Sequence, residues 1–118
     1  MRVALGQFAV SRTWEDNLAT TVRLMREAAA GRADLLVLPE GILARDITDP
    51  DLVLKAAQPL DGPFMTAVLA ESAAHPLTVQ MCIHVPNGQG RAFNILVTLA
   101  QGAIVATYKK LHLYDAFN

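Results

Sequence analysis

The first third of the chain contains two short apolar runs separated by one long amphipathic segment. Residues 2–10 and 34–40 are rich in apolar side chains, which predicts two buried strands. Between them, residues 11–31 carry apolar side chains at helical spacing, which predicts a helix with one inward face. This order of strand, helix and strand predicts a right-handed crossover between two parallel strands.

The helix predicted over residues 11–31 has sequence signals at both of its ends. Thr13 is the expected N-cap, because Glu15 and Asp16 follow it in the first turn, and Gly31 is the expected stop. The residues expected on the inward face are Leu18, Val22, Met25 and Ala29.

The middle of the chain predicts a long connection followed by a second helix. Residues 41–60 are expected to form the connection, which contains an acidic patch at Asp46, Asp49 and Asp51. A helix should begin near Asp61, as its cap, with Pro63 in the first turn. It should end before the pair His75–Pro76, because the residue before a proline resists helical backbone angles.

The last third predicts three strands joined by two turns. The strands are expected over residues 77–86, 91–100 and 103–113, with turns at 87–90 and 101–102. Both turns would join antiparallel neighbours, whereas the first strands are expected to be parallel. The sequence therefore predicts an α/β fold with a mixed sheet.

Composition and charge exclude several classes of protein. A chain of 118 residues and 12.7 kDa corresponds to one domain or to part of one. Its net charge of −1 and its scattered lysines and arginines provide no basic stripe for a nucleic acid. The longest apolar run is too short and too often interrupted to cross a membrane, and the single cysteine, Cys82, excludes an internal disulfide. A cytoplasmic protein is expected.

The end of the second predicted strand carries a candidate catalytic carboxylate. Glu40 closes the apolar run VLPE, directly after a proline that ends the strand ladder. In open α/β sheets, ligand sites gather at the carboxyl ends of strands. Glu40 is therefore a candidate site residue, and the alternative is a surface glutamate in a loop.

The last predicted strand ends in two lysines, and strand alternation separates them. Tyr108, Lys110 and His112 are expected on one face, and Lys109 is expected on the other face with leucines. A lysine held in an enclosed site can stabilise developing negative charge. The alternative is a pair of solvated lysines that protect a strand edge from aggregation.

Cys82 is the one candidate for a sulfur nucleophile in the sequence. Alternation places it on the same face as Gln80 and His84, so one hypothesis makes His84 its catalytic partner. A cysteine in the middle of a strand more often behaves as a small apolar filler. We therefore expect Cys82 to be structural.

Two motifs, taken in order, resemble those of the nitrilase superfamily of carbon–nitrogen hydrolases. They are LLVLPEG, which contains Glu40, and YKKLHLYD, which contains Lys110. The opening VALGQF, the segment LDGPF and the hairpin that contains IVATY also match comparable family segments. The resemblance covers essentially the whole chain and is greatest for amidases of small ω-amide acids, including those that hydrolyse deaminated glutathione. It implies an α-β-β-α sandwich, of which residues 1–118 are the N-terminal part of a single domain.

The resemblance also implies roles for two residues. The superfamily uses a triad of Glu, Lys and Cys, in which Glu40 matches the general base and Lys110 matches the lysine that stabilises the oxyanion. In the family mechanism a cysteine thiolate attacks the carbonyl of a small amide, ammonia leaves, and water hydrolyses the thioester. The resemblance implies neither a metal nor an organic cofactor, and it implies association into homo-oligomers.

The sequence departs from the family pattern at the nucleophile. The family cysteine follows the lysine motif by several tens of residues, whereas Cys82 precedes that motif and does not map onto it. Ile95 stands where the family often has a small polar residue. Family domains are also much longer, so we expect a truncated hydrolase that is inactive alone. The alternative is a non-catalytic interaction module that self-associates or pairs with a separate C-terminal half.

Overall fold

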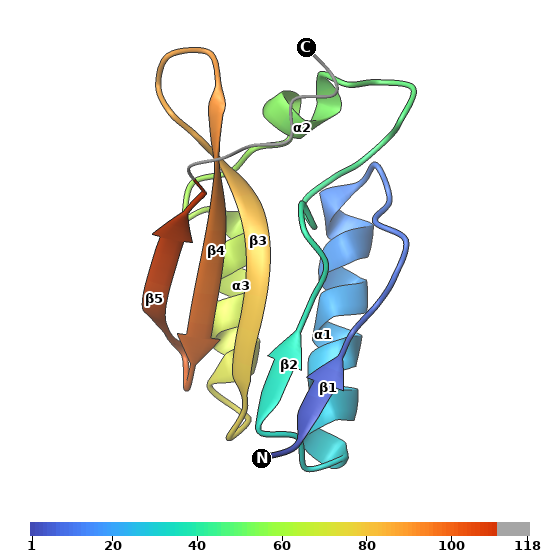
Figure 1. Ribbon diagram of the computed structural model, residues 1–118, viewed down its shortest axis with the longest axis vertical. Helices are drawn as coiled ribbons and strands as arrows, with labels where there is room; N and C mark the ends of the chain where they lie inside the picture. Colours follow the sequence, from blue (N-terminus) through green and yellow to red (C-terminus); the bar gives the residue numbers. More distant parts are fainter. Residues whose placement is uncertain (111–118) are drawn as a thin grey trace.

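A computed structural model describes residues 1–110, which form one sheet with helices against one of its faces (Figure 1). The strands, in their spatial order, are β1 (Val3–Leu5), β2 (Leu35–Val37), β3 (Thr78–Pro86), β4 (Ala92–Ala100) and β5 (Ala103–Lys109). The helices are α1 (Trp14–Ala30), α2 (Leu52–Lys55) and α3 (Pro63–Ser72). Within the described residues, no helix is long and apolar enough to cross a membrane.

The sheet is mixed, as the sequence predicted. Strands β1, β2 and β3 are parallel neighbours, whereas β3, β4 and β5 pair antiparallel through two hairpins. The register pairs Cys82 with Leu96 and Leu96 with Tyr108, so these three side chains share one face. The predicted α/β fold class is therefore confirmed.

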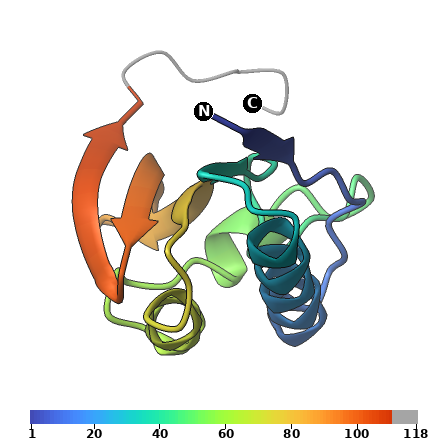
Figure 2. The same ribbon diagram turned by 90° about the horizontal axis from the view of Figure 1, so that it is seen from below.

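The core lies between the sheet and the helices α1 and α3, which pack on the same side of it (Figure 2). The strands contribute the fully or nearly fully buried side chains of Leu36, Val79, Met81, Ile83, Val97 and Leu99. The helices contribute Met25, Phe64, Met65 and Val68. Burying each such side chain contributes roughly 1.5–3 kcal/mol of hydrophobic free energy, so this face provides most of the stability.

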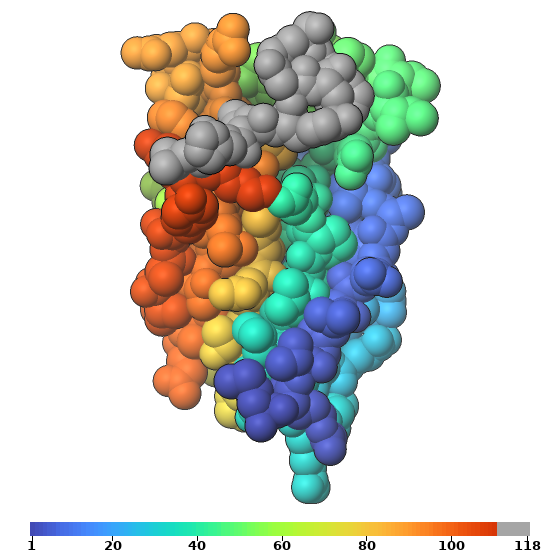
Figure 3. All heavy atoms as spheres, in the orientation of Figure 1, coloured from blue at the N-terminus to red at the C-terminus, as the bar shows by residue number. Residues whose placement is uncertain are grey.

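Within residues 1–110 no helix lies over the opposite face of the sheet (Figures 1 and 2), and atoms of the strands are visible from that side in Figure 3. Leu5 at one edge is 72% exposed and Tyr108 at the other is 56% exposed. We call this the open face. Its middle strands carry polar side chains as well, and there the Gln80 amide donates to the Thr98 hydroxyl at 3.3 Å.

The predicted strands over residues 2–10 and 34–40 are both shorter in the structure, where they end at Leu5 and Val37. Gly6 makes the last ladder contact of β1, donating to Val37 O at 2.9 Å. A Cβ at Gly6 would lie 2.9 Å from a methyl group of Leu38, so a larger residue would require the Leu38 side chain to shift. The residues after Gly6 then turn away from the sheet, and Pro39 ends β2 because it has no N–H group.

Helix α1 has the predicted ends, but its predicted inward face was wrong in part. Thr13 is the N-cap and Gly31 the C-cap. The fully buried positions are Asn17, Thr21, Met25 and Ala28, whereas Leu18, Val22 and Ala29 are only half-buried. The polar Asn17 takes an inward position because its amide is fully hydrogen-bonded there, which removes the cost of burying it.

The predicted cap of helix α3 was also wrong. The N-cap is Gly62 rather than Asp61, with Pro63 at the first helical position. The orphan N–H of Phe64 donates to the Gln58 side-chain oxygen at 2.9 Å, so a residue from the preceding loop satisfies it instead of Asp61. The connection over residues 41–60 holds the short helix α2, which the sequence did not predict. Strand β5 ends at Lys109, and the predicted positions 111–113, including His112, lie outside the described residues.

Candidate functional site

The two residues predicted to act together, Glu40 and Lys110, are in contact. Glu40 follows β2 and Lys110 follows β5, so β3 and β4 lie between the strands that carry them. The Lys110 ammonium donates a hydrogen bond to a carboxylate oxygen of Glu40. The Lys110 backbone N–H donates to Asn94 O at 2.9 Å, which fixes the base of the side chain at the end of the ladder. The tertiary structure therefore brings together two charges that are distant in sequence.

In this ion pair the Glu40 side chain is largely exposed to solvent, whereas the Lys110 side chain is mostly shielded from it. The Lys110 side chain is 29% exposed and the Glu40 side chain is 64% exposed. The hydrogen bond to Glu40 raises the pKa of Lys110, and partial burial opposes this only in part. Lys110 therefore keeps its positive charge throughout the neutral range, as a group that stabilises an oxyanion must.

Lys109 lies on the opposite face, as alternation predicted. Its ammonium is 3.7 Å from the centroid of the Phe93 ring, a cation–π contact. Its strand partner is Ile95, which belongs to the buried core. Lys109 thus covers the edge of the core, and Lys110 alone faces Glu40.

Cys82 and His84 lie on the open face of β3, one of the two strands between those that carry Glu40 and Lys110. Cys82 is only 7% exposed, and burial raises the pKa of its thiol although the nearby Lys110 charge acts the other way. Burial also lowers the pKa of His84, whose ring packs against Gly41. Both groups are therefore neutral near pH 7, and no hydrogen bond among residues 1–110 joins them. These features are those of a structural cysteine.

A cavity of about 400 Å³ opens beside Glu40. Its walls are Phe8, Ala9, Val10, Pro39, Glu40, Arg45, Asp46 and Ile47. One wall comes from the segment that leaves β1, and the other from the loop that follows β2. The sequence did not reveal this cavity, because neither segment has a hydrophobic period that would mark its residues as neighbours.

Asn17 of α1 connects the two walls of the cavity, and the sequence analysis missed this role. Its side-chain N–H groups donate to Ser11 O at 2.9 Å and to Leu43 O at 3.0 Å, and its oxygen accepts from Ser11 N at 2.9 Å. Asn17 is 2% exposed. The one signal in the sequence is an amide in the inward i, i+4 row of a helix together with Thr21 and Met25.

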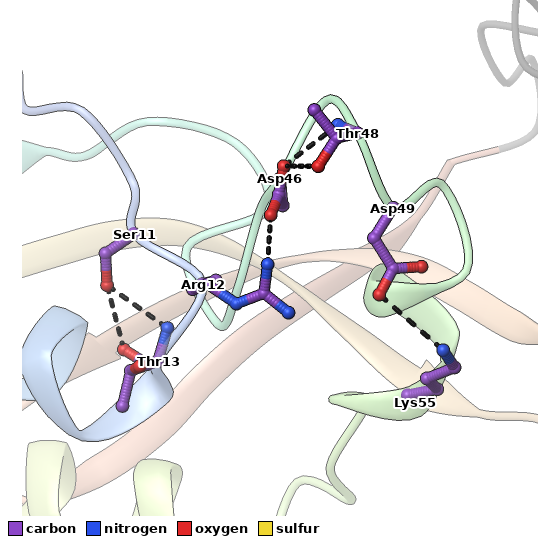
Figure 4. Close-up of polar contacts among 7 residues, drawn as sticks. All are labelled: Ser11, Arg12, Thr13, Asp46, Thr48, Asp49 and Lys55. Atoms are coloured by element: carbon purple, nitrogen blue, oxygen red, sulfur yellow. Dashed lines mark hydrogen bonds and ion pairs between the residues drawn. The ribbon is translucent and has the colours of Figure 1, made fainter.

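The predicted acidic patch of the 41–60 connection is largely neutralised by ion pairs (Figure 4). Asp46 pairs with Arg12 and also accepts from Thr48 N at 2.9 Å and from the Thr48 hydroxyl at 2.7 Å. These bonds, those from Thr48 above all, lower the pKa of Asp46. Lys55 lies 3.6 Å from Asp49. The pairs are solvent-exposed, so they order the loop more than they stabilise the protein.

The described part of the chain contains no group of three or more histidine, cysteine, aspartate or glutamate residues that could hold a metal ion. Glu40 and Lys110 provide a carboxylate and an ammonium, and the Cys82 thiol is close enough to interact with both charges. A carboxylate can transfer protons, and an ammonium can stabilise an oxyanion.

Residues 2–118 match the family model described as "Carbon-nitrogen hydrolase". The chain is 51% identical over 117 residues to the deaminated glutathione amidase of Escherichia coli O157:H7, covering 99% of this chain and 45% of that protein. It is 32% identical over 121 residues to the human deaminated glutathione amidase, covering 96% of this chain and 36% of that protein. The chain thus spans less than half the length of these curated relatives.

Solved structures show the same fold over nearly the whole chain. A Caenorhabditis elegans NitFhit protein has a TM-score of 0.83 at 19% identity, covering 96% of this chain and 28% of that one. An amidase of the nitrilase superfamily from Nesterenkonia has a TM-score of 0.81 at 19% identity, covering 98% of this chain and 44% of that one. The helix and sheet layers described above therefore have the nitrilase architecture and correspond to part of its sandwich.

Proposed function

This chain belongs to the carbon–nitrogen hydrolase family, and we propose that it supplies two members of a catalytic triad that hydrolyses a small linear amide. In this proposal Glu40 is the general base and Lys110 stabilises the oxyanion. The third member is a cysteine outside the 118 residues. The observation that carries the proposal is the contact between Glu40 and Lys110 at the ends of β2 and β5.

Each residue has a defined task in this reaction. The thiolate attacks the amide carbon, and Lys110 donates to the carbonyl oxygen as it becomes negative. Glu40 takes the thiol proton and delivers it to the departing nitrogen, so that ammonia leaves and a thioester remains. Glu40 then removes a proton from water, which attacks the thioester and releases the acid and the thiol. Because Lys110 stays protonated, it serves both tetrahedral intermediates.

The substrate class follows from the relatives. Two of them are named as deaminated glutathione amidases. We propose that the substrate of this protein is likewise an ω-amide or a compound like deaminated glutathione. Cys82 is not the nucleophile in this proposal, because its buried thiol has a raised pKa. The 118-residue chain alone should therefore release no ammonia above background.

A chimera tests the proposed roles. Residues 1–118 are fused to the part of the E. coli relative that this chain does not match, and ammonia release from a small ω-amide acid is measured. Glu40→Gln should lower kcat by about 10²–10⁴-fold, the usual contribution of a general base. Glu15→Gln, an exposed carboxylate in the first turn of α1, is the matched control. Unchanged activity of the Glu40→Gln chimera would show that Glu40 is not the general base. If the 118-residue chain alone released ammonia, and Glu40→Ala abolished that release, the predicted inactivity of the 118-residue chain would be wrong.

A second candidate function is association without catalysis, favoured by the exposed apolar side chains of the open face. Val3 is 49% exposed, and Leu5 and Tyr108 are more so. In this case the chain would self-associate or bind a separate C-terminal half. Sedimentation decides: a monodisperse monomer at all concentrations argues against self-association. A native mass near 12.7 kDa would favour this second function, because the cell would then make no cysteine-bearing half in the same chain.

A further inference from the structure

We propose that Arg45 selects the substrate by binding a carboxylate in the cavity that Arg45 and Glu40 both line. The proposal rests on the proposed function for the reaction at Glu40, but the binding step that it describes can be tested without hydrolysis. The ligand is the ω-amide acid of the proposed function, and the new element is the residue that binds its carboxylate.

The charges of the cavity walls provide the first argument. Three of the wall residues are charged: Glu40, Arg45 and Asp46. Glu40 is paired with Lys110, and Asp46 is paired with Arg12. Within residues 1–110 no carboxylate forms an ion pair with Arg45, so the cavity retains one positive charge. A ligand that carries a single negative charge neutralises it.

The second argument is that the backbone beneath Arg45 is held in place. Ile42, Leu43 and Ala44, the three residues before it, are at most 3% exposed. The N–H of Arg45 donates to Ser11 O at 2.9 Å, which ties it to the opposite wall of the cavity. Asp46 follows directly and is fixed by Arg12 and Thr48 (Figure 4). Arg45 therefore projects from a preorganised base, which reduces the entropy lost on binding.

The third argument is the match between the walls and the ligand class. A guanidinium binds a carboxylate through two parallel hydrogen bonds, a geometry that a lysine does not reproduce. Phe8, Val10, Pro39 and Ile47 supply apolar wall surface, which suits methylene groups. The cavity volume of about 400 Å³ lies within the usual range of small-molecule pockets. Its charged and apolar wall residues together thus suit an ω-amide acid.

A binding experiment on the 118-residue chain tests the inference. Backbone amide and arginine Nε–Hε resonances are followed by NMR while glutaramate, which carries one carboxylate, or glutaramide, its neutral diamide, is added. Glutaramate should shift resonances of Arg45 and of the two cavity walls in a saturable way, and glutaramide should not. Arg45→Gln should weaken glutaramate binding by about 10-fold or more, the usual effect of losing a charge-assisted pair. Arg91→Gln, an exposed arginine in the β3–β4 loop, should leave binding unchanged.

The same variants in the chimera distinguish this inference from the proposed function. Arg45→Gln should raise KM for glutaramate by about 10-fold or more and change kcat/KM for glutaramide less than twofold. Equal binding of the two compounds, or unchanged binding in Arg45→Gln, overturns the role of Arg45 even if the chimera is an active amidase. Saturable, Arg45-dependent binding combined with an inactive chimera supports the carboxylate site and counts against the catalytic roles of Glu40 and Lys110.

Discussion

The two faces of the sheet are built by the same strands but have opposite properties. On the covered face, Val79, Met81 and Ile83 are fully buried against the helices. On the open face, the alternating positions of the same strand are Gln80, Cys82 and His84, beside the Glu40–Lys110 pair. The comparison shows how a change of one position along a strand moves a side chain from the buried core to the face that carries the Glu40–Lys110 pair.

The largest expected difference between the faces is in activity, at the neighbours Lys109 and Lys110. In the chimera, Lys110→Met should lower kcat by about 10²–10³-fold, because the oxyanion loses its charged donor. Lys109→Met removes the same charge from the other face and should change kcat less than threefold. Ammonia release under saturating substrate measures both. Equal losses in the two variants would show that the faces do not divide chemistry from structure.

The next difference concerns stability, at the neighbours Met81 and Gln80. Met81→Ala should reduce the free energy of unfolding by about 2–5 kcal/mol, because it leaves a cavity in the core beneath α1 and α3. Gln80→Ala loses only a half-exposed hydrogen bond to Thr98 and should cost about 1 kcal/mol or less. Urea unfolding of the 118-residue chain measures both. A cost for Gln80→Ala as large as that for Met81→Ala would contradict the assignment of the core to one face.

A substitution at Asn17 tests whether this buried polar residue of α1 also holds the cavity walls in place for ligand binding. Asn17→Ala leaves Ser11 N and Leu43 O without their partner, whereas Ser11 O keeps the Arg45 N–H, and the change should cost about 1–3 kcal/mol. The matched change is Thr20→Ala on the same helix, whose hydroxyl donates to Asp16 O at 3.2 Å. Urea unfolding gives the cost, and glutaramate binding should weaken in Asn17→Ala alone. An effect on stability without an effect on binding would show that Asn17 does not position the cavity.

The smallest effect is the pH dependence that His84 gives to the open face. Burial lowers the pKa of His84 below its ordinary value of about 6.5. The unfolded chain then binds the proton more readily, so the stability contributed by neutral His84 is fully present above pH 6.5 and is lost as pH falls below it. The free energy of unfolding should therefore decrease more steeply between pH 7 and pH 5 in the original chain than in His84→Gln. Parallel slopes would show that His84 is not buried in its neutral form.

Local backbone geometry explains what could be predicted from the sequence. A strand repeats every two residues, so alternation alone separated Lys110 from Lys109 and placed Cys82 with His84. Helical spacing and the glycine at position 31 gave the bounds of α1. The position of Glu40 directly after a buried strand and a proline made it a candidate site residue, and that role stays a prediction. These features depend on neighbours within a few positions, which the sequence displays directly.

Contacts between distant segments decided the rest. Asn17 lies on the inward face of α1 because its side chain donates to the carbonyl of Leu43, 26 positions away. Gln58 rather than Asp61 caps α3 because the preceding loop folds back onto the start of the helix. Strand β1 ends where Gly6 passes Leu38. The cavity with Arg45 is lined by two segments that are distant in sequence and that Asn17 joins. No local pattern encodes these pairings, since their free energy is gained only after the chain has folded.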